Sequence, residues 1–159
     1  MDDIDRKILE GLQDQGRISN QDLAEQVGIS TAACWRRVRA LENDGTIDGY
    51  TALLNRRRLG LALCAFVHVS LSRHQRESTL DFEAAVRDRP EVLECFATTG
   101  DADFILRVVT DDIESFDRFL EEFLFGLEGI AQVRSNIALR ELKFATALPL
   151  PAAGGKQYS

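Results

Sequence analysis

A chain of 159 residues, with 45% hydrophobic and 28% charged residues, forms one ordinary domain or two small ones rather than a disordered or fibrous protein. Its net charge of -7 gives no overall attraction to nucleic acid, and it has no apolar stretch of membrane-spanning length. The N-terminus lacks the basic and then apolar run of a signal peptide, so we expect a cytoplasmic protein with no membrane partner.

Cysteine and histidine give no sign of a metal site. Cys34, Cys64 and Cys95 are widely separated and form no Cys-x-x-Cys pair, so we expect buried free thiols. His68 and His74 are not at metal-ligand spacing on a helix. We therefore expect neither a metal nor a cofactor.

Positive charge is concentrated near the N-terminus. Residues 1–60 carry nine Lys/Arg against ten Asp/Glu, a net charge of -1, so most of the negative charge lies in the rest of the chain. No acidic residue lies between Glu25 and Glu42, and this interval contains Arg36, Arg37 and Arg39. A local surface of this kind can bind DNA even in an acidic protein.

Three capped amphipathic patterns occupy the first part of the chain. Asp2 or Asp3 can cap the first helix, which ends by Gly16; the second runs between Ser19 and Gly28. The third begins after Ser30 and ends by Gly45, following a very short turn. This arrangement predicts a helix-turn-helix, in which the last helix enters the DNA major groove.

The third helix has one apolar and one basic side. At 100° per residue, Cys34, Val38 and Leu41 lie together, and Arg36 lies nearly opposite them. Small residues near the start of the helix let its backbone approach DNA closely, and arginine can bind guanine or phosphate. The alternatives are a solvated helix face and, for Trp35, burial against the first helix. The candidate DNA-binding residues are Ser30, Thr31, Ala32, Ala33, Trp35, Arg36, Arg37 and Arg39.

The segment after the third helix connects it to the rest of the chain. Turn signals at Asp44-Gly45 and Asp48-Gly49 surround residues suited to short strands, which predicts a wing or a connecting strand over 47–53. A basic linker follows and either contacts phosphates or is a solvated boundary; its arginines are Arg56, Arg57 and Arg58.

The last hundred residues predict an α+β domain with the order β-α-β-β-α-β, a ferredoxin-like pattern. We expect Leu80 and Val86 on the buried face of its first helix. The helices cover one sheet face, and nothing in the chain remains for the other, which predicts self-association through the sheet. The expected strands are 61–72, 91–100, 103–110 and 130–139, with 141–148 extending or following the last, and the expected helices are 77–90 and 112–127.

The stretch "TTGDADF" between two strands has the groups needed to hold a free amino acid. Gly100 can expose backbone N–H groups to a carboxylate, and Asp101 or Asp103 can hold an ammonium group. The alternative is an ordinary hairpin turn.

Residues 2–150 resemble the Lrp/AsnC (feast/famine) family of bacterial transcriptional regulators. The resemblance is carried in order by "IDRKILEGLQDQGRIS", "LAEQVGIS", "CWRRVRALENDGTIDGYTALLN", "PEVLEC", "TGDADFILRV" and "ALPL". It implies binding to double-stranded DNA, a homodimer that assembles further, often to an octamer, and a small amino-acid effector. The family often has proline where this chain has Ala32 or Ala33, so the start of the third helix can differ.

The family resemblance also implies an effector pocket between neighbouring dimers. The matching turn supplies Gly100, Asp101 and Asp103, and a weaker match by spacing falls on the last strand. We expect Asp103 to face the effector ammonium group, although Asp101 could exchange roles with it. The candidate effector-binding residues are Thr98, Thr99, Gly100, Asp101, Asp103, Ser135 and Asn136.

The expected organisation is a helix-turn-helix domain at 1–50, a linker strand at 51–60, an effector-binding and oligomerisation domain at 61–150, and a flexible tail at 151–159. The expected function is a DNA-binding regulator of amino-acid metabolism or transport, not an enzyme. One alternative is an effector-sensing oligomer without DNA binding. The other is a ferredoxin-like enzyme using Asp101, Asp103 and His68, for which no catalytic motif is present.

Overall fold

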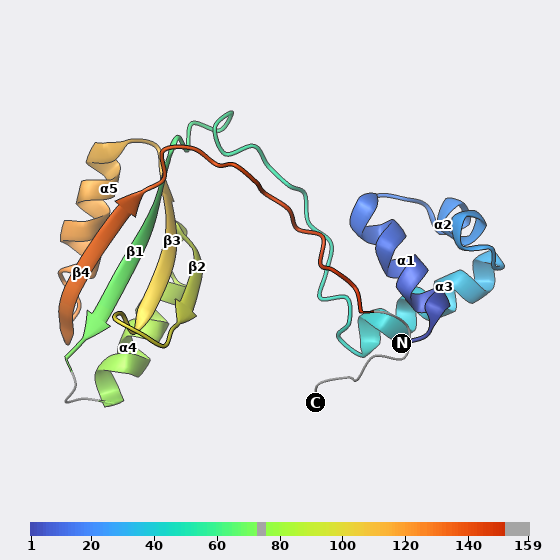
Figure 1. Ribbon diagram of the computed structural model, residues 1–159, viewed down its shortest axis with the longest axis horizontal. Helices are drawn as coiled ribbons and strands as arrows, with labels where there is room; N and C mark the ends of the chain where they lie inside the picture. Colours follow the sequence, from blue (N-terminus) through green and yellow to red (C-terminus); the bar gives the residue numbers. More distant parts are fainter. Residues whose placement is uncertain (73–75, 152–159) are drawn as a thin grey trace. The chain divides into compact units, whose positions relative to one another are not determined.

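The computed structural model describes residues 1–72 and 76–151, which fold into two compact units (Figure 1). One unit comprises Met1–Leu53 together with the chain from Lys143 onward, and the other comprises Leu54–Leu142. The expected tail at 151–159 lies outside the described residues apart from Pro151.

The first unit contains the three expected helices: α1 (Asp3–Asp14), α2 (Asn20–Val27) and α3 (Thr31–Asn43). Each begins where a polar side chain accepts a hydrogen bond from a free backbone N–H of the first turn, and the caps are Asp2, Ser19 and Ser30. Gly28 ends α2 with a φ of 80°, a left-handed conformation that favours glycine. The helix starts read from the sequence are confirmed.

One apolar core joins the three helices. Ile8 of α1, Leu23 of α2 and Cys34 of α3 are almost completely buried against one another. Leu150, far along the chain, packs against this same core and is partly buried. The helix-turn-helix unit is therefore completed by a segment from the end of the chain.

The second unit is a four-stranded antiparallel sheet with the order β2-β3-β1-β4 (Figure 1). The chain order is β-α-β-β-α-β, as the sequence predicts. Its elements are β1 (Leu63–Leu71), α4 (Arg76–Arg87), β2 (Val92–Ala97), β3 (Phe104–Thr110), α5 (Ile113–Phe119) and β4 (Ile130–Ile137). A π-helical turn, Leu120–Leu124, continues α5.

The two helices cover one face of the sheet. Val67 and Val69 of β1 pack with Phe82 of α4 and Phe116 of α5 in one buried cluster. Side chains alternate along a strand, so Phe66, the residue before Val67, points to the other face. Phe66 is accordingly 42% exposed.

Several local expectations are wrong. Residues 47–53 form no strand: Ile47 donates its N–H to the Leu41 carbonyl at the end of α3, and the extended chain beyond has no strand partner among the described residues. Residues 141–148 form no strand because the chain leaves the sheet after β4 and joins the first unit.

Three details of the second unit also differ from expectation. Leu80 is 67% exposed, and Phe82 takes the buried position on α4 instead. Cys95 is exposed because β2 is an edge strand of the sheet, whereas Cys34 and Cys64 are buried free thiols as expected. The expected helix over 112–127 is α-helical only to Phe119.

Candidate functional site

The exposed face of α3 is fixed by what its other face buries. The Ser30 hydroxyl accepts a hydrogen bond from the Ala33 N–H at 3.3 Å, which starts the helix. Cys34, Val38 and Leu41 are buried in the core. A helix fixed along one side by packing presents its opposite side in a defined orientation, as recognition by contact requires.

Most of the candidate DNA-binding residues lie on that opposite side. Trp35 is 52% exposed, so about half of its surface remains open to a partner, and it lines a hollow with Leu12 of α1. The Arg39 guanidinium lies 5.6 Å from the centre of the Trp35 ring, a cation–π contact, and 3.2 Å from the Glu42 carboxylate. Trp35 also lines a shallow hollow with Asn20, Thr31, Ala32 and Arg36.

Arg37 has a different environment from the other two arginines. Its Nη1 donates hydrogen bonds of 2.7 Å to Asp2 and Asp5 at the start of α1. These bonds raise the pKa of Arg37, with Asp5 contributing more than Asp2. Arg37 therefore links α3 to α1, whereas Arg36 and Arg39 are exposed on the free face.

The turn between β2 and β3 is held by its own backbone and by β1. The Thr98 hydroxyl donates to the Ala102 carbonyl at 2.7 Å, and the Thr98 N–H donates to the Asp103 carbonyl at 2.9 Å. Gly100 has a φ of 142°, a conformation that L side chains rarely adopt. The glycine thus lets the turn fold tightly beside β1.

The two aspartates of the turn have separate surroundings. Asp103 Oδ2 accepts a hydrogen bond of 2.7 Å from the Leu71 N–H at the end of β1, so its carboxylate holds the turn to the sheet. Asp101 instead lines a pocket. Of the two carboxylates expected to hold an ammonium group, Asp101 lines the pocket, whereas Asp103 is bonded to β1.

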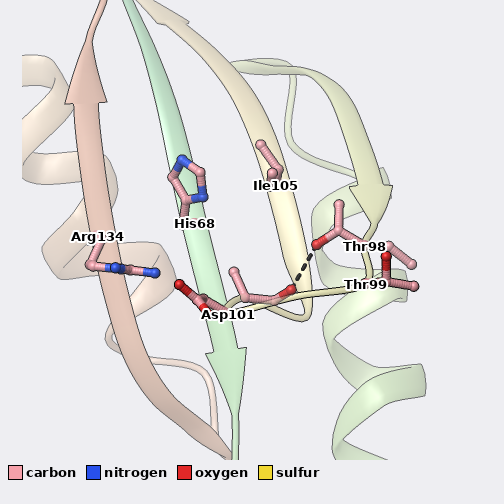
Figure 2. A pocket seen from close by; sticks show the side chains of 8 residues that line it. His68, Thr98, Thr99, Asp101, Ile105 and Arg134 are labelled. Atoms are coloured by element: carbon pink, nitrogen blue, oxygen red, sulfur yellow. Dashed lines mark hydrogen bonds between the residues drawn. The ribbon is translucent and has the colours of Figure 1, made fainter.

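The pocket lies on the sheet face that the helices leave open. Figure 2 shows Arg134 of β4 and Asp101 of the turn pointing toward one another, with His68 of β1 and Ile105 of β3 nearby. Strand register brings these residues together, since His68 pairs with both Arg134 and Ile105. The full lining is His68, Ala97, Thr98, Thr99, Asp101, Ala102, Ile105 and Arg134.

The pocket therefore combines expected and unexpected residues. Thr98, Thr99 and Asp101 were expected; Arg134 was missed, and His68 was considered only as a catalyst. Ser135 and Asn136 do not line the pocket. Asn136 lies opposite Phe66 and Ser135 opposite Val67, so the two side chains point to different faces of the sheet.

The open sheet face carries apolar side chains beyond the pocket. Phe96 of β2 is 57% exposed and pairs with the half-buried Ile105 of β3, in addition to Phe66 of β1. Between the edge strand β2 and its neighbour β3, Arg107 Nε lies 3.2 Å from Glu94 Oε2. An apolar sheet face with a charged pair suits contact with another protein surface.

Two other classes of site receive no support. Within residues 1–72 and 76–151, no cluster of three His, Cys, Asp or Glu side chains could hold a metal ion. Among the same residues, no helix is both long and apolar enough to span a bilayer.

Both units match known family models. Residues 1–48 match the model of a winged helix-turn-helix DNA-binding domain, and residues 64–148 match the model of the Lrp/AsnC ligand binding domain. The two models together cover most of the chain.

Relatives match along nearly their whole length. The Bkd operon transcriptional regulator of Pseudomonas aeruginosa is 43% identical over 150 residues, 94% of this chain and 98% of the relative. A leucine-responsive regulatory protein of Rhizobium meliloti is 45% identical over 146 residues, 91% and 93% of the two chains. A Neisseria meningitidis transcriptional regulator, solved as an L-Met complex, matches with a TM-score of 0.90 and 40% identity, covering 94% and 96%.

Proposed function

This chain belongs to the Lrp/AsnC family of DNA-binding transcriptional regulators, and we propose that α3 reads its operator while the Asp101–Arg134 pocket binds a small amino acid. The relatives are named as regulators, so the enzyme alternative has no support from them. A helix-turn-helix domain and a ligand-binding domain in one chain allow a bound metabolite to change how the protein binds DNA.

DNA recognition is assigned to the exposed face of α3. Arg36 and Arg39 supply charge that can bind guanine edges or phosphates, and Ala32 lets the helix approach the groove closely. Arg37 is assigned mainly to holding α3 against α1, because both its neighbouring carboxylates already accept from it.

The pocket suits a zwitterion. The Arg134 guanidinium is complementary to a carboxylate, and the Asp101 carboxylate is complementary to an ammonium group. The two charges point toward one another across the pocket, and an α-amino acid carries its own two charges close together. Ile105 and Ala97 offer apolar contacts for a small aliphatic side chain. The L-Met complex of the Neisseria relative supports this ligand class.

The open sheet face is assigned to assembly with further copies of this chain. Phe66, Phe96 and Ile105 leave apolar surface that a homodimer would bury, and such dimers would then associate to an octamer. Such assembly would bring two α3 helices to half-sites separated by whole turns of DNA, about 34 Å per turn.

The observation that carries the effector assignment is the facing pair Asp101 and Arg134. Isothermal calorimetry of the full chain against a panel of L-amino acids tests it, with D-leucine and leucine amide as probes lacking the correct stereochemistry or carboxylate. Saturable binding of one or more L-amino acids, weakened by Arg134→Gln, is the expected result. Binding that Arg134→Gln and Asp101→Asn both leave unchanged contradicts it.

A further inference from the structure

The end of the chain docks on the first helix. Leu148 donates its backbone N–H to Gln13 Oε1 at 2.6 Å and accepts from Gln13 Nε2 at 3.2 Å. One side-chain amide thus satisfies both polar groups of one peptide residue, much as a neighbouring strand would. Two residues further, Leu150 packs against the core formed by the three helices. Together these contacts fix residues 148–150 to α1.

The docked segment is continuous with the strand that carries Arg134. After β4 ends, the Ala138 N–H still donates to the Cys64 carbonyl of β1 at 2.8 Å, and the chain then leaves the sheet. Residues 139–147 are exposed and join this point to the docked Leu148. The segment is therefore a second connection between the ligand-binding unit and the three helices, covalent at β4 and non-covalent at its docked end, additional to the covalent one after α3.

We propose that residues 143–150 act as a second tether, anchored through Gln13, which restricts the positions that the DNA-reading unit takes relative to the sheet. A unit held by one flexible linker samples many orientations, whereas a second anchored connection removes most of them. Gln13 is a positioning residue in this scheme, since it acts through the segment and not on DNA.

The tether also couples the effector pocket to α3, and this part of the inference rests on the proposed function. Arg134 lies on β4, so a ligand that moves this strand shifts the origin of the tether. The docked end then transfers that shift to α1, against which α3 is packed. The coupling would change DNA affinity by a factor typical of allostery, about 5- to 150-fold.

Hydrogen exchange of the full chain tests the docking without any effector. The Leu148 amide is expected to exchange about tenfold or more faster in Gln13→Ala, because its acceptor is removed. Gln13→Glu, which keeps an acceptor oxygen, should retain protection, and the matched control Gln15→Ala, an exposed glutamine nearby, should behave as wild type. A Leu148 amide that is unprotected in wild type, or unaffected by Gln13→Ala, overturns the docking.

Binding to the promoter fragment beside the protein's own gene tests the tether, measured with and without L-methionine or L-leucine. Gln13→Ala and Leu150→Asp should reduce the amino-acid effect on DNA affinity toward a ratio of one, while calorimetric binding of the amino acid persists. If Gln13→Ala loses protection of the Leu148 amide but keeps the wild-type ratio of DNA affinities with and without the amino acid, the tether role is overturned. If no L-amino acid of the calorimetry panel binds wild type, the effector assignment fails, and the exchange experiment still decides the docking.

Discussion

Arg37 Nη1 lies 2.7 Å from Asp5 Oδ1, so the arginine that is central to the sequence of α3 also holds α3 to the start of α1. The same nitrogen lies 2.7 Å from Asp2 Oδ2. The Arg37 side chain therefore points toward α1, whereas the side chains of Arg36 and Arg39 point to the exposed face. This division of roles predicts different consequences for each substitution.

Arg37→Ala should lower stability more than DNA specificity. The ion pair with Asp2 is exposed and the one with Asp5 is only partly buried, so we expect a decrease in melting temperature of only ~1–3 °C. Differential scanning calorimetry measures it, with Arg36→Ala as the control that leaves the melting temperature unchanged. Equal melting temperatures for the two variants would contradict the division of roles.

Arg36→Ala should weaken specific DNA binding by ~1–3 kcal/mol if the side chain contacts a base, and by less with a reduced salt slope if it contacts phosphate. Fluorescence anisotropy at several salt concentrations separates the two cases. The control is Arg87→Ala, which removes an exposed arginine from α4 in the other unit. Unchanged affinity and salt slope in an Arg36→Ala, Arg39→Ala double variant would exclude α3 as the reader.

Acid should weaken the contacts of the Asp2 carboxylate with the first turn of α1 and with Arg37. The pKa of Asp2 is lowered from its ordinary value of 3.8, first by the Asp5 N–H and next by Arg37. A carboxyl with a depressed folded pKa stabilises the fold above its unfolded pKa, and this contribution is lost as pH falls through the lower folded pKa. Melting temperatures followed from pH 6 to pH 2 should therefore decline less below pH 3.8 in Asp2→Asn than in wild type. Parallel declines would show that Asp2 contributes nothing.

The open sheet face should control assembly. Phe66→Glu places a charge in the proposed interface and is expected to convert the oligomer to smaller species at micromolar concentration. Size-exclusion chromatography with light scattering measures the mass. Leu80→Glu is the matched control, because Leu80 is exposed on α4, in the layer that covers the other sheet face. A monomeric wild type, or equal masses for both variants, would contradict the assembly proposal.

Local sequence patterns predicted the helices and most of the sheet for a clear physical reason. Ser19, Ser30 and Gly28 act within one turn of where they stand, so their effects can be read from neighbouring residues. The apolar spacing of Cys34 and Val38 likewise predicts which face of α3 is buried.

Other features depend on partners that are distant in the sequence. Arg134 joins the pocket only because β4 pairs with β1 in the register that sets it beside His68. Asp103 is diverted from the pocket by the Leu71 N–H of another strand. Leu150 leaves the sheet unit to complete the helical core, although its neighbours suggested a strand. Spacing along the chain does not encode such pairings.

The central claim is that one protein binds promoter DNA through α3 and that an amino acid changes this binding through the Asp101–Arg134 pocket. Anisotropy of a labelled fragment from the promoter beside its own gene, titrated with wild type, Arg36→Ala and Asp101→Asn with and without the amino acid found by calorimetry, tests both parts. Arg36→Ala is expected to lose DNA affinity, whereas Asp101→Asn is expected to retain it but no longer to respond to the amino acid. Equal DNA affinity of wild type and Arg36→Ala, or an undiminished response in Asp101→Asn, would contradict it.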